Sequence, residues 1–442
     1  MKKEMNMDLF EIEQQLENHY VMHTYARKPV NFVRGEGMYL YDDKGKSYLD
    51  FLSGIGCISV GHCNPAVSAA LARQASRLVH VGNYFYVEGR GVLAEKLNTL
   101  LSAPGTARDT CKHAWKTFFA NSGAEANEGA IKLARKHGKL KLNGAATIVS
   151  AQKSFHGRTL AALAATGQES KQAVFTPMPA GFVHTPLNDI EALKHVLDAQ
   201  DAAAHLAGDE RAGVMDASTK PEGGSNEASV CAVLLECIQG EAGIWPCTME
   251  YLKAVRELTA ERGILLIIDE IQTGFFRTGT YPFSFQHYGI IPDVVTMAKG
   301  IANGVPMGAF AAYGELGDLL QPGEHGSTFG GSLLAIAAAN ATIDEMLDMD
   351  VANKVAATGA YFAAGLAHLP KVSDIRGLGL MRGVTLTEPI AAAVGEAALE
   401  KGLVLNVIGD SVLRFLPPLI ATTEHVDEAL GILKESLMWS PA

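Results

Sequence analysis

The feature that most constrains this fold is the alternation of short apolar runs with amphipathic stretches through the middle of the chain. The apolar runs are rich in β-branched residues, a pattern typical of buried strands. Strands that alternate with helices form a mostly parallel sheet covered by helices, so the sequence predicts an α/β fold. The small residues of "GAFAAY" leave the direction of that strand open. The expected strands are residues 146–150, 230–236, 264–270, 293–300 and 308–313, with amphipathic stretches that include 127–141 and 249–263.

The two ends of the chain have a different pattern. Aromatic and β-branched runs flank "DDKGK" within residues 31–51, which is typical of a hairpin. From about residue 331 onward, long Ala-rich stretches alternate with short strands such as 412–420. We therefore expect a second, smaller domain. The expected division assigns residues 1–65 and 331–442 to the smaller domain and residues 66–330 to the larger one.

Composition and charge argue against several classes of protein. The 442-residue chain is 48% hydrophobic, which is typical of a packed globular protein. Its formal net charge of −11 argues against a nucleic-acid partner, because phosphate binding requires a basic surface. Residues 1–20 carry acids where a signal peptide has its apolar core, and no apolar run is long enough to span a bilayer. We expect a cytoplasmic protein that does not bind membranes.

The cysteines and one polar segment carry little functional signal. Six cysteines are too few for a disulfide framework in a chain of this length. Cys57 and Cys63 are separated by five residues, as are Cys231 and Cys237, so neither pair has the CxxC spacing of a zinc site. We expect reduced thiols and no metal. Residues 208–229 are polar and rich in Gly and Ser, which indicates a mobile surface insert without a catalytic role.

Chemistry-bearing residues follow three of the expected strands. Ile264 to Ile268 form an unbroken apolar run that ends in Asp269, and a carboxylate in such a place is costly unless a cation pairs with it. Lys299 follows another strand, 30 residues further on. The strand-like "TFFA" is followed by Asn121-Ser122-Gly123-Ala124 and then by a helical pattern. Because α/β proteins bind ligands at the carboxyl ends of their strands, we expect these groups to share one site.

The junction at Ser122 has two interpretations, which are compatible. Ser122 and Glu125 have the spacing of a helix capping box. A helix N-terminus also binds anions through its free N–H groups, and Gly123 lets a ligand approach closely. Lys299 has small neighbours, among them Ala298 and Gly300, as though the backbone must lie against a ligand. A phosphate cradle, a lysine able to form a Schiff base and a carboxylate able to hold a pyridine nitrogen protonated predict a pyridoxal 5′-phosphate site.

Seven motifs in order carry a resemblance to a known family. The chain from about residue 30 to its end resembles the class III (subgroup II) pyridoxal-phosphate-dependent aminotransferases of fold type I. That fold implies a large domain with a mostly parallel seven-stranded sheet covered by helices, and a smaller α+β domain built from both termini. The motifs are "YLDFLSGIGCISVGHCNPAV", "NSGAEANEGAIKLARK", "SFHGRTLAALAATGQ", "QGEAGI", "IIDEIQTGFFRTG", "MAKGIANGVPMGA" and "HGSTFGG".

The resemblance implies roles for the residues of these motifs. Lys299 would form the Schiff base and move the proton at the reacting carbon, and Asp269 would hold the pyridinium. Phe155 would stack on the ring, and Gln272 would contact its phenolic oxygen. Thr328 would reach the phosphate in the neighbouring subunit and Ser327 the substrate there, which implies a homodimer with shared active sites. The remaining cofactor contacts would be Ser122, Gly123 and Ala124 at the phosphate, together with Glu270 and Ile271.

Substrate recognition is also implied by the resemblance. Arg158 would bind the α-carboxylate bidentately, which suits a guanidinium better than an ammonium. Arg414 would bind the second carboxylate of 2-oxoglutarate or glutamate, and Glu241 would neutralise Arg414 while the amino donor is bound. The chain departs from the family pattern at Cys237, at Ala242 and in "GGSLLA", where "EP", "GEGG" and "GGNPLA" are usual. None of these departures removes a catalytic group, but those beside Glu241 leave the geometry of the gate open.

Within the family, Asn127 and "HGRTLAALAATG" resemble the acetylornithine branch most. This implies transamination of N2-acetyl-L-ornithine with 2-oxoglutarate to N-acetyl-L-glutamate 5-semialdehyde and L-glutamate, a step of arginine biosynthesis. Succinylornithine, succinyldiaminopimelate, 4-aminobutyrate and ornithine stay open as alternative donors. An aminomutase would share Lys299 and Asp269 but would not need Arg158 or a gate. A non-catalytic binding protein would not need Lys299.

Overall fold

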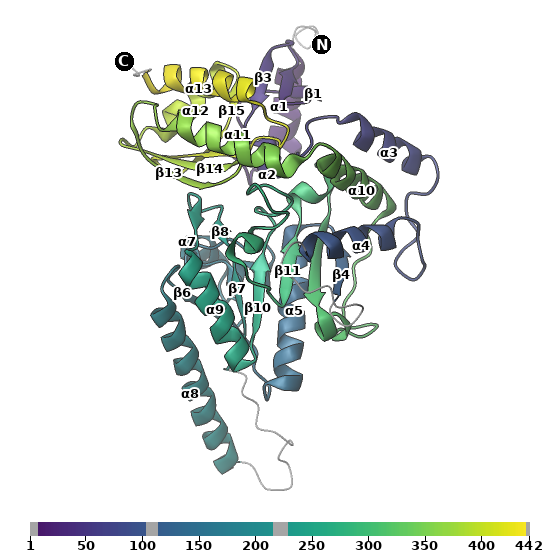
Figure 1. The fold of residues 1–442 in the computed structure, drawn as a ribbon, viewed down its shortest axis with the longest axis vertical. Helices are drawn as coiled ribbons and strands as arrows, with labels where there is room; N and C mark the ends of the chain where they lie inside the picture. The colour runs from purple at the N-terminus through teal and green to yellow at the C-terminus, as the bar shows by residue number, and fades with distance from the viewer. Residues whose placement is uncertain (1–7, 103–113, 215–228, 439–442) are drawn as a thin grey trace.

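The computed structural model describes residues 8–102, 114–214 and 229–438. A large sheet with its covering helices forms one part, and a smaller part with both chain ends lies above the sheet in Figure 1. The strands of the large sheet, in spatial order, are β4 (Trp115–Ala120), β12 (Gly308–Tyr313), β11 (Val294–Met297), β10 (Leu265–Asp269), β7 (Val230–Leu235), β5 (Thr147–Ala151) and β6 (Phe182–Thr185).

The predicted mostly parallel, seven-stranded sheet is confirmed. Strands β11, β10, β7, β5 and β6 pair in parallel, whereas β12 is antiparallel to both β11 and β4. This answers the open question about "GAFAAY", which is the one reversed strand among the seven. Strand β6 was not predicted, because "FVHT" is only four residues long and half-buried.

Helices cover both faces of the sheet, so successive residues of a strand face different helices. In β10, Leu265 and Ile267 pack in the core cluster that contains α5, while Leu266 and Ile268 pack in the larger cluster on the other face. This explains the unbroken apolar run, since both side-chain sets are buried. The helices and short helical turns of this region are α3 (Pro65–Ala75), α4 (Arg90–Leu101), α5 (Gly123–Lys141), α6 (Leu160–Ala165), α7 (Glu169–Gln172), η1 (Ala173–Phe175), α8 (Ile190–Val214), α9 (Met249–Arg262), η2 (Ser284–Tyr288), η3 (Lys299–Ala302), η4 (Gly314–Asp318) and α10 (Leu333–Asp348).

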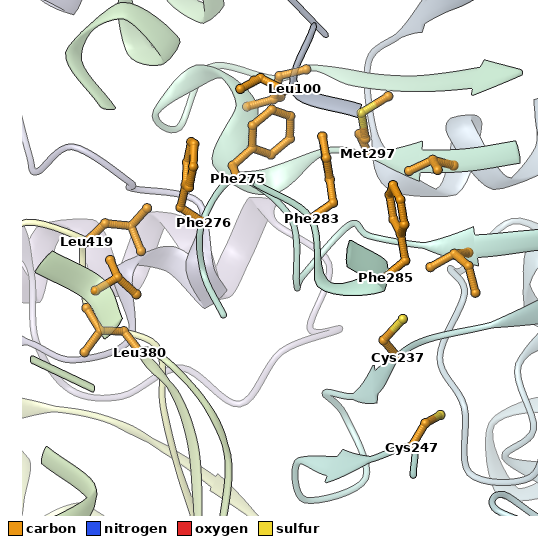
Figure 2. Packing of buried hydrophobic residues seen from close by; sticks show 14 of the residues in the cluster. Leu100, Cys237, Cys247, Phe275, Phe276, Phe283, Phe285, Met297, Leu380 and Leu419 are labelled. Atoms are coloured by element: carbon orange, nitrogen blue, oxygen red, sulfur yellow. The ribbon is translucent and has the colours of Figure 1, made fainter. Parts of the chain in front are cut away.

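The larger core cluster contains a group of aromatic side chains beside the end of β10. Figure 2 shows Phe275 next to Phe283, with Phe285 further along. The rings of Phe275 and Phe283 meet edge to face with centroids 5.4 Å apart, which is a favourable aromatic geometry. This packing fixes the loop that follows Asp269.

The smaller part is built from segments near both ends of the chain, as expected. Strand β15 (Leu403–Val404) pairs in parallel with β3 (Ser47–Asp50), which joins the two segments in one sheet. The other elements are α1 (Leu9–Tyr20), β1 (Phe32–Glu36), β2 (Tyr39–Asp42), α2 (Ser53–Gly56), α11 (Val351–Leu366), β13 (Val372–Leu378), β14 (Met381–Leu386), α12 (Ala391–Glu400), β16 (Asn406–Ile408), β17 (Val412–Phe415) and α13 (Thr423–Met438). The short antiparallel pair of β8 (Ile238–Gln239) and β9 (Trp245–Pro246) follows β7 in the middle of the chain, and β9 contacts β13 of the smaller part. The domain boundaries after residues 65 and 330 stay predictions.

The predicted insert at 208–229 is only partly described. Helix α8 continues to Val214, so the first part of that segment is helical rather than a loop. Residues 215–228 lie outside the described residues. No helix of the described residues is long and apolar enough to cross a bilayer.

The carboxyl ends of the parallel strands face the smaller part of the molecule. The buried Arg277, just after β10, donates through Nη1 to the carbonyls of Leu380 and Pro417. Ser59 donates to the carbonyl of Gly300, directly after Lys299. These contacts fix the loops after β10 and β11 against the smaller part, and a cavity lies beside them.

Candidate active site

A cavity of about 350 Å³ lies at the carboxyl ends of the strands. Ten of the residues predicted from the sequence line it, and they come from loops after five different strands. Such a cavity is large enough for a cofactor-sized ligand. The ten residues are Ser122, Gly123, Ala124, Phe155, Arg158, Glu241, Asp269, Ile271, Gln272 and Lys299.

Asp269 is a buried carboxylate held by three donors. Its Oδ2 accepts from Asn127 Nδ2 at 2.9 Å and lies 2.8 Å from His156 Nδ1, and its Oδ1 accepts from the Ile271 amide at 3.0 Å. Because side chains alternate along β10, Asp269 lies on the same face of the sheet as Leu265 and Ile267. Helix α5, which contains Asn127, covers this face. The protein therefore orients this carboxylate before any ligand binds.

His156 was missed as a site residue from the sequence. It is almost completely buried and lines the cavity, and its Nε2 has no hydrogen-bond partner among the described residues. Its only sequence signal is its place between Phe155 and Arg158 in "SFHGR". Because a buried ring nitrogen without a partner is costly, this atom marks a place where a bound group is expected.

Lys299 lies at the beginning of η3, directly after strand β11. Its backbone φ of 45° is left-handed, an uncommon conformation for a residue with a side chain, and such strain is often found at functional sites. Burial is the main cause that lowers the pKa of its ammonium, followed by opposing effects of Glu241 and Arg414. A lowered pKa makes a larger share of the amine neutral and therefore nucleophilic.

The junction before α5 has the helix cap that the sequence suggested, but not the complete capping box, and the anion site there stays a prediction. Ser122 Oγ accepts from the Glu125 amide at 3.2 Å, so Ser122 caps the helix. The Glu125 carboxylate bonds to the amide of Asn121 rather than to that of Ser122, so the capping box is not reciprocal. The amides of Gly123 and Ala124 belong to the first turn, where no intrahelical acceptor exists. A Cβ on Gly123 would lie 2.8 Å from Ile271 Cδ1, so only glycine fits between helix and loop.

Two arginines at the cavity differ in environment. Arg414 is 2% exposed, and its Nη1 donates to Glu241 Oε1 at 2.7 Å and to the Gly240 carbonyl at 2.9 Å. Burial is the largest single effect and would raise the pKa of Glu241, but the charges of Arg414 and Lys299 and the hydrogen bonds from Arg414 and Gln272 together lower the pKa to about 2. Gln272 Nε2 also donates to Glu241 Oε1, at 3.1 Å. Arg158, by contrast, is exposed and makes no hydrogen bond or ion pair with any described residue.

Four predicted residues are not among those that line this cavity: Arg414, which lies behind Glu241, and Glu270, Ser327 and Thr328. Glu270 follows Asp269 and therefore points to the opposite face, where it accepts from Thr273, Ser284 and the Phe285 amide. Its position does not fit a cofactor contact within the chain. Thr328 is exposed and lines a separate small cleft, while Ser327 bonds to Asn121 at the edge of the main cavity.

Comparison with known proteins identifies the family. Residues 20–437 match the profile of the family Aminotransferase class-III. The chain belongs to this family. It is a pyridoxal-phosphate-dependent aminotransferase of fold type I.

The similarity extends along almost the whole aminotransferase. The chain is 44% identical over 426 residues to an acetylornithine aminotransferase of Caldanaerobacter subterraneus subsp. tengcongensis, and the match covers 95% of this chain and 98% of that protein. It is 45% identical to an acetylornithine aminotransferase of Gloeobacter violaceus, covering 96% of each chain. Its fold matches the ornithine aminotransferase of Toxoplasma gondii with a TM-score of 0.84 at 29% identity, covering 98% of this chain and 94% of that one. That structure was solved with partial occupancy of PLP at its active site.

The residues that line the cavity of this aminotransferase fit pyridoxal phosphate. It combines a glycine-lined helix N-terminus, an aromatic wall at Phe155, a lysine with a lowered pKa and a buried carboxylate. Besides His156 Nε2, the buried Gln272 Oε1 has no partner among the described residues. The described residues contain no cluster of acids, histidines or cysteines that could hold a metal ion.

Glu236 is a further residue of the site that the sequence did not indicate. Its Oε2 accepts from the Phe155 amide at 3.0 Å and its Oε1 from the Gly240 amide at 3.3 Å. Burial raises the pKa of Glu236 to about 7, with a smaller opposing effect of His156. One carboxyl group thus links the loop that carries the ring wall to the loop that carries Glu241.

Proposed function

We propose that this aminotransferase transfers the δ-amino group of N2-acetyl-L-ornithine to 2-oxoglutarate, giving N-acetyl-L-glutamate 5-semialdehyde and L-glutamate. The observation that carries the proposal is the pair of unlike arginines, one free at Arg158 and one neutralised by Glu241 at Arg414. N2-acetyl-L-ornithine has one carboxylate, whereas 2-oxoglutarate has two. A site that serves both therefore benefits from a second cation that is masked for one substrate and free for the other. The relatives named acetylornithine aminotransferase, at 41–45% identity, favour this donor over ornithine or 4-aminobutyrate.

Arg158 would bind the α-carboxylate in both half-reactions, since it is exposed to the cavity and has no competing partner. Arg414 would bind the additional carboxylate of 2-oxoglutarate or glutamate after Glu241 moves away. Glu241 would cover Arg414 while the uncharged arm of the donor is bound, because an unpaired buried guanidinium is costly. Cys237 and Ala242 flank this segment without changing the charge of the pair.

When bound, pyridoxal phosphate supplies a carbonyl group that accepts the amino group and a ring that withdraws electrons from the substrate carbon. Lys299 would hold the cofactor covalently and then move the proton at the δ-carbon of the donor or at the α-carbon of glutamate. Asp269, fixed by His156 and Asn127, would keep the ring nitrogen protonated. Ser122, Gly123 and Ala124 would bind the phosphate, and Phe155 and Ile271 would contact the ring.

We further propose a homodimer in which Ser327 and Thr328 serve the partner's site. Their position outside the main cavity of their own chain supports this arrangement. A cytoplasmic location is also proposed, because the five cysteines within the described residues are all free thiols. Specific activity measured over a concentration series, together with sedimentation, tests the dimer. A fully active monomer would refute the shared site.

The donor is tested by steady-state kinetics with a panel of ω-amino donors and 2-oxoglutarate. We expect the highest kcat/KM with N2-acetyl-L-ornithine, and lower values with N-succinylornithine, N-succinyldiaminopimelate, ornithine and 4-aminobutyrate. A higher kcat/KM with any other donor would assign the enzyme to that substrate instead. Product identification by mass spectrometry would exclude an aminomutase, which forms an isomer of its substrate and needs no 2-oxoglutarate.

A further inference from the structure

A second cation without an ion-pair partner among the described residues lies near Arg158, beside the Phe155 wall of the cavity. Lys171, in the short helix α7, has its Nζ 5.0 Å from the centroid of the Phe155 ring. The guanidinium carbon of Arg158 lies 5.6 Å from the centroid of the same ring. Phe155 is a wall of the cavity, so the two cations approach one aromatic wall of the active site.

No fixed anion balances this pair of cations. Lys171 is half-buried, and its ammonium group forms no hydrogen bond or ion pair with another described residue. Burial is the main cause that lowers the pKa of its ammonium, and the like charge of Arg158 is the second. A cation in such a place is stabilised only in part by the face of a phenyl ring.

The neighbouring carboxylates are already committed. Glu241 is bonded to Arg414 and Gln272, and the raised pKa of Glu236, about 7, leaves that group only partly ionised at neutral pH. Asp269 is engaged by His156 and Asn127 on the α5 side. The excess positive charge near Phe155 is therefore available to a ligand that brings its own negative charge.

We propose that Lys171 is a substrate-binding residue that, together with Arg158, binds the α-carboxylate of the amino donor and the corresponding carboxylate of glutamate. The reason is that a carboxylate placed at Phe155 meets two unpaired cations and relieves their mutual repulsion. Glu169 and Ser170, the neighbours of Lys171 in α7, are exposed, so of these three residues only Lys171 is turned toward this wall. This inference rests on the proposed function for the identity of the donor.

The experiment compares Lys171→Met, Lys171→Arg and the wild-type holoenzyme in the two half-reactions, followed separately by the cofactor's absorbance. Lys141→Met, an exposed lysine at the end of α5, is the matched control. For Lys171→Met we expect the apparent Kd for both N2-acetylornithine and glutamate to rise about 5- to 30-fold, the loss of one charged contact at a partly exposed position. The saturating rate should change less than about twofold, and Lys171→Arg should restore most of the affinity.

A donor without a carboxylate, N-acetylputrescine, shows whether the contact is to that group. Its reaction should be equally slow in the wild type and in Lys171→Met. An equal loss with all three substrates would overturn the proposal, because Lys171 would then only support the packing of Phe155. Unchanged affinity for N2-acetylornithine and glutamate, or an effect confined to N-succinylornithine, would also overturn it. If the wild type does not act on N2-acetylornithine, the donor assignment fails, while the glutamate half-reaction still tests Lys171.

Discussion

The gate that we propose for Glu241 and Arg414 makes the sharpest prediction. In Glu241→Gln the side chain keeps its shape and can still accept from Gln272, but Arg414 loses its counterion. The pKa of Glu241 is lowered from 4.5 to about 2, and at 1.36 kcal/mol per pKa unit this corresponds to roughly 3 kcal/mol. Because the folded-state pKa is lowered, this stabilisation is present above pH 4.5 and is lost only as the pH falls through about 2. The full effect therefore applies in an assay near neutral pH.

The substitution should act on the two substrates in opposite directions. With the amino donor bound, Arg414 stays buried without a counterion and keeps only its bond to the Gly240 carbonyl, so we expect the KM for N2-acetylornithine to rise about 10- to 100-fold. With 2-oxoglutarate, no ion pair has to open before the second carboxylate binds, so its KM should fall at least about threefold. The upper end of the first range corresponds to roughly 3 kcal/mol. The lower end allows for the 23% exposure of the Glu241 side chain, which weakens the pair.

Initial rates over a matrix of both substrate concentrations give the two KM values in one experiment. Arg414→Ala is the complementary variant and should raise the KM for 2-oxoglutarate by about 10- to 100-fold, with a much smaller change in the half-reaction of N2-acetylornithine. Glu257→Gln, on the exposed side of α9, is the control for the loss of one acid. If Glu241→Gln changed both KM values in the same direction, the pair would be structural, and the reasoning from a movable gate would be wrong.

Three further predictions concern the other charged groups. Asp269→Asn should retain cofactor absorbance but lose about 10²-fold or more in kcat, roughly 3 kcal/mol, because an amide cannot stabilise a charged ring nitrogen; unchanged activity would make Asp269 a structural acid. Lys299→Ala should fold normally by circular dichroism and show no turnover, and a near wild-type rate would refute the assignment. The raised pKa of Glu236 should lower the free energy of unfolding by roughly 3 kcal/mol as the pH rises from 4.5 to 7, and Glu236→Gln should remove this slope in urea denaturation.

The order of elements was predictable because its signals are local. The run before Asp269 had to be a strand buried on both faces, and the structure packs its alternate residues into two different clusters. Because successive side chains of a strand point to opposite faces, Asp269 and Glu270 lie on different sides of the sheet. The family resemblance implied that both contact the cofactor. Strand β6 was missed because four half-buried residues carry too little apolar signal.

The partners of the site residues could not be derived from sequence in the same way. Arg414 and Glu241 are 173 residues apart, and only the family resemblance suggested that they meet. His156 and Glu236 were missed because a single histidine or glutamate next to a motif is most often a surface or capping group. Their roles become visible only when three loops meet and leave His156 Nε2 without a partner in the part of the chain that the structure describes.

Two buried carboxyl groups five residues apart illustrate how the fold sets the charge of this site. Burial raises the pKa of both Glu236 and Glu241, but only Glu241 contacts a guanidinium, so its pKa falls to about 2 while that of Glu236 rises to about 7. Near neutral pH the negative charge of Glu241 is thus neutralised by Arg414, and Glu236 is only partly ionised. The positive charge of Arg158 has no counterpart within the described chain, and the balance is completed only by an anionic substrate. A cavity with this balance disfavours amines that lack a carboxylate, because they leave the Arg158 cation unpaired. We therefore expect the charge of the cavity, as much as its shape, to favour amino acids as donors.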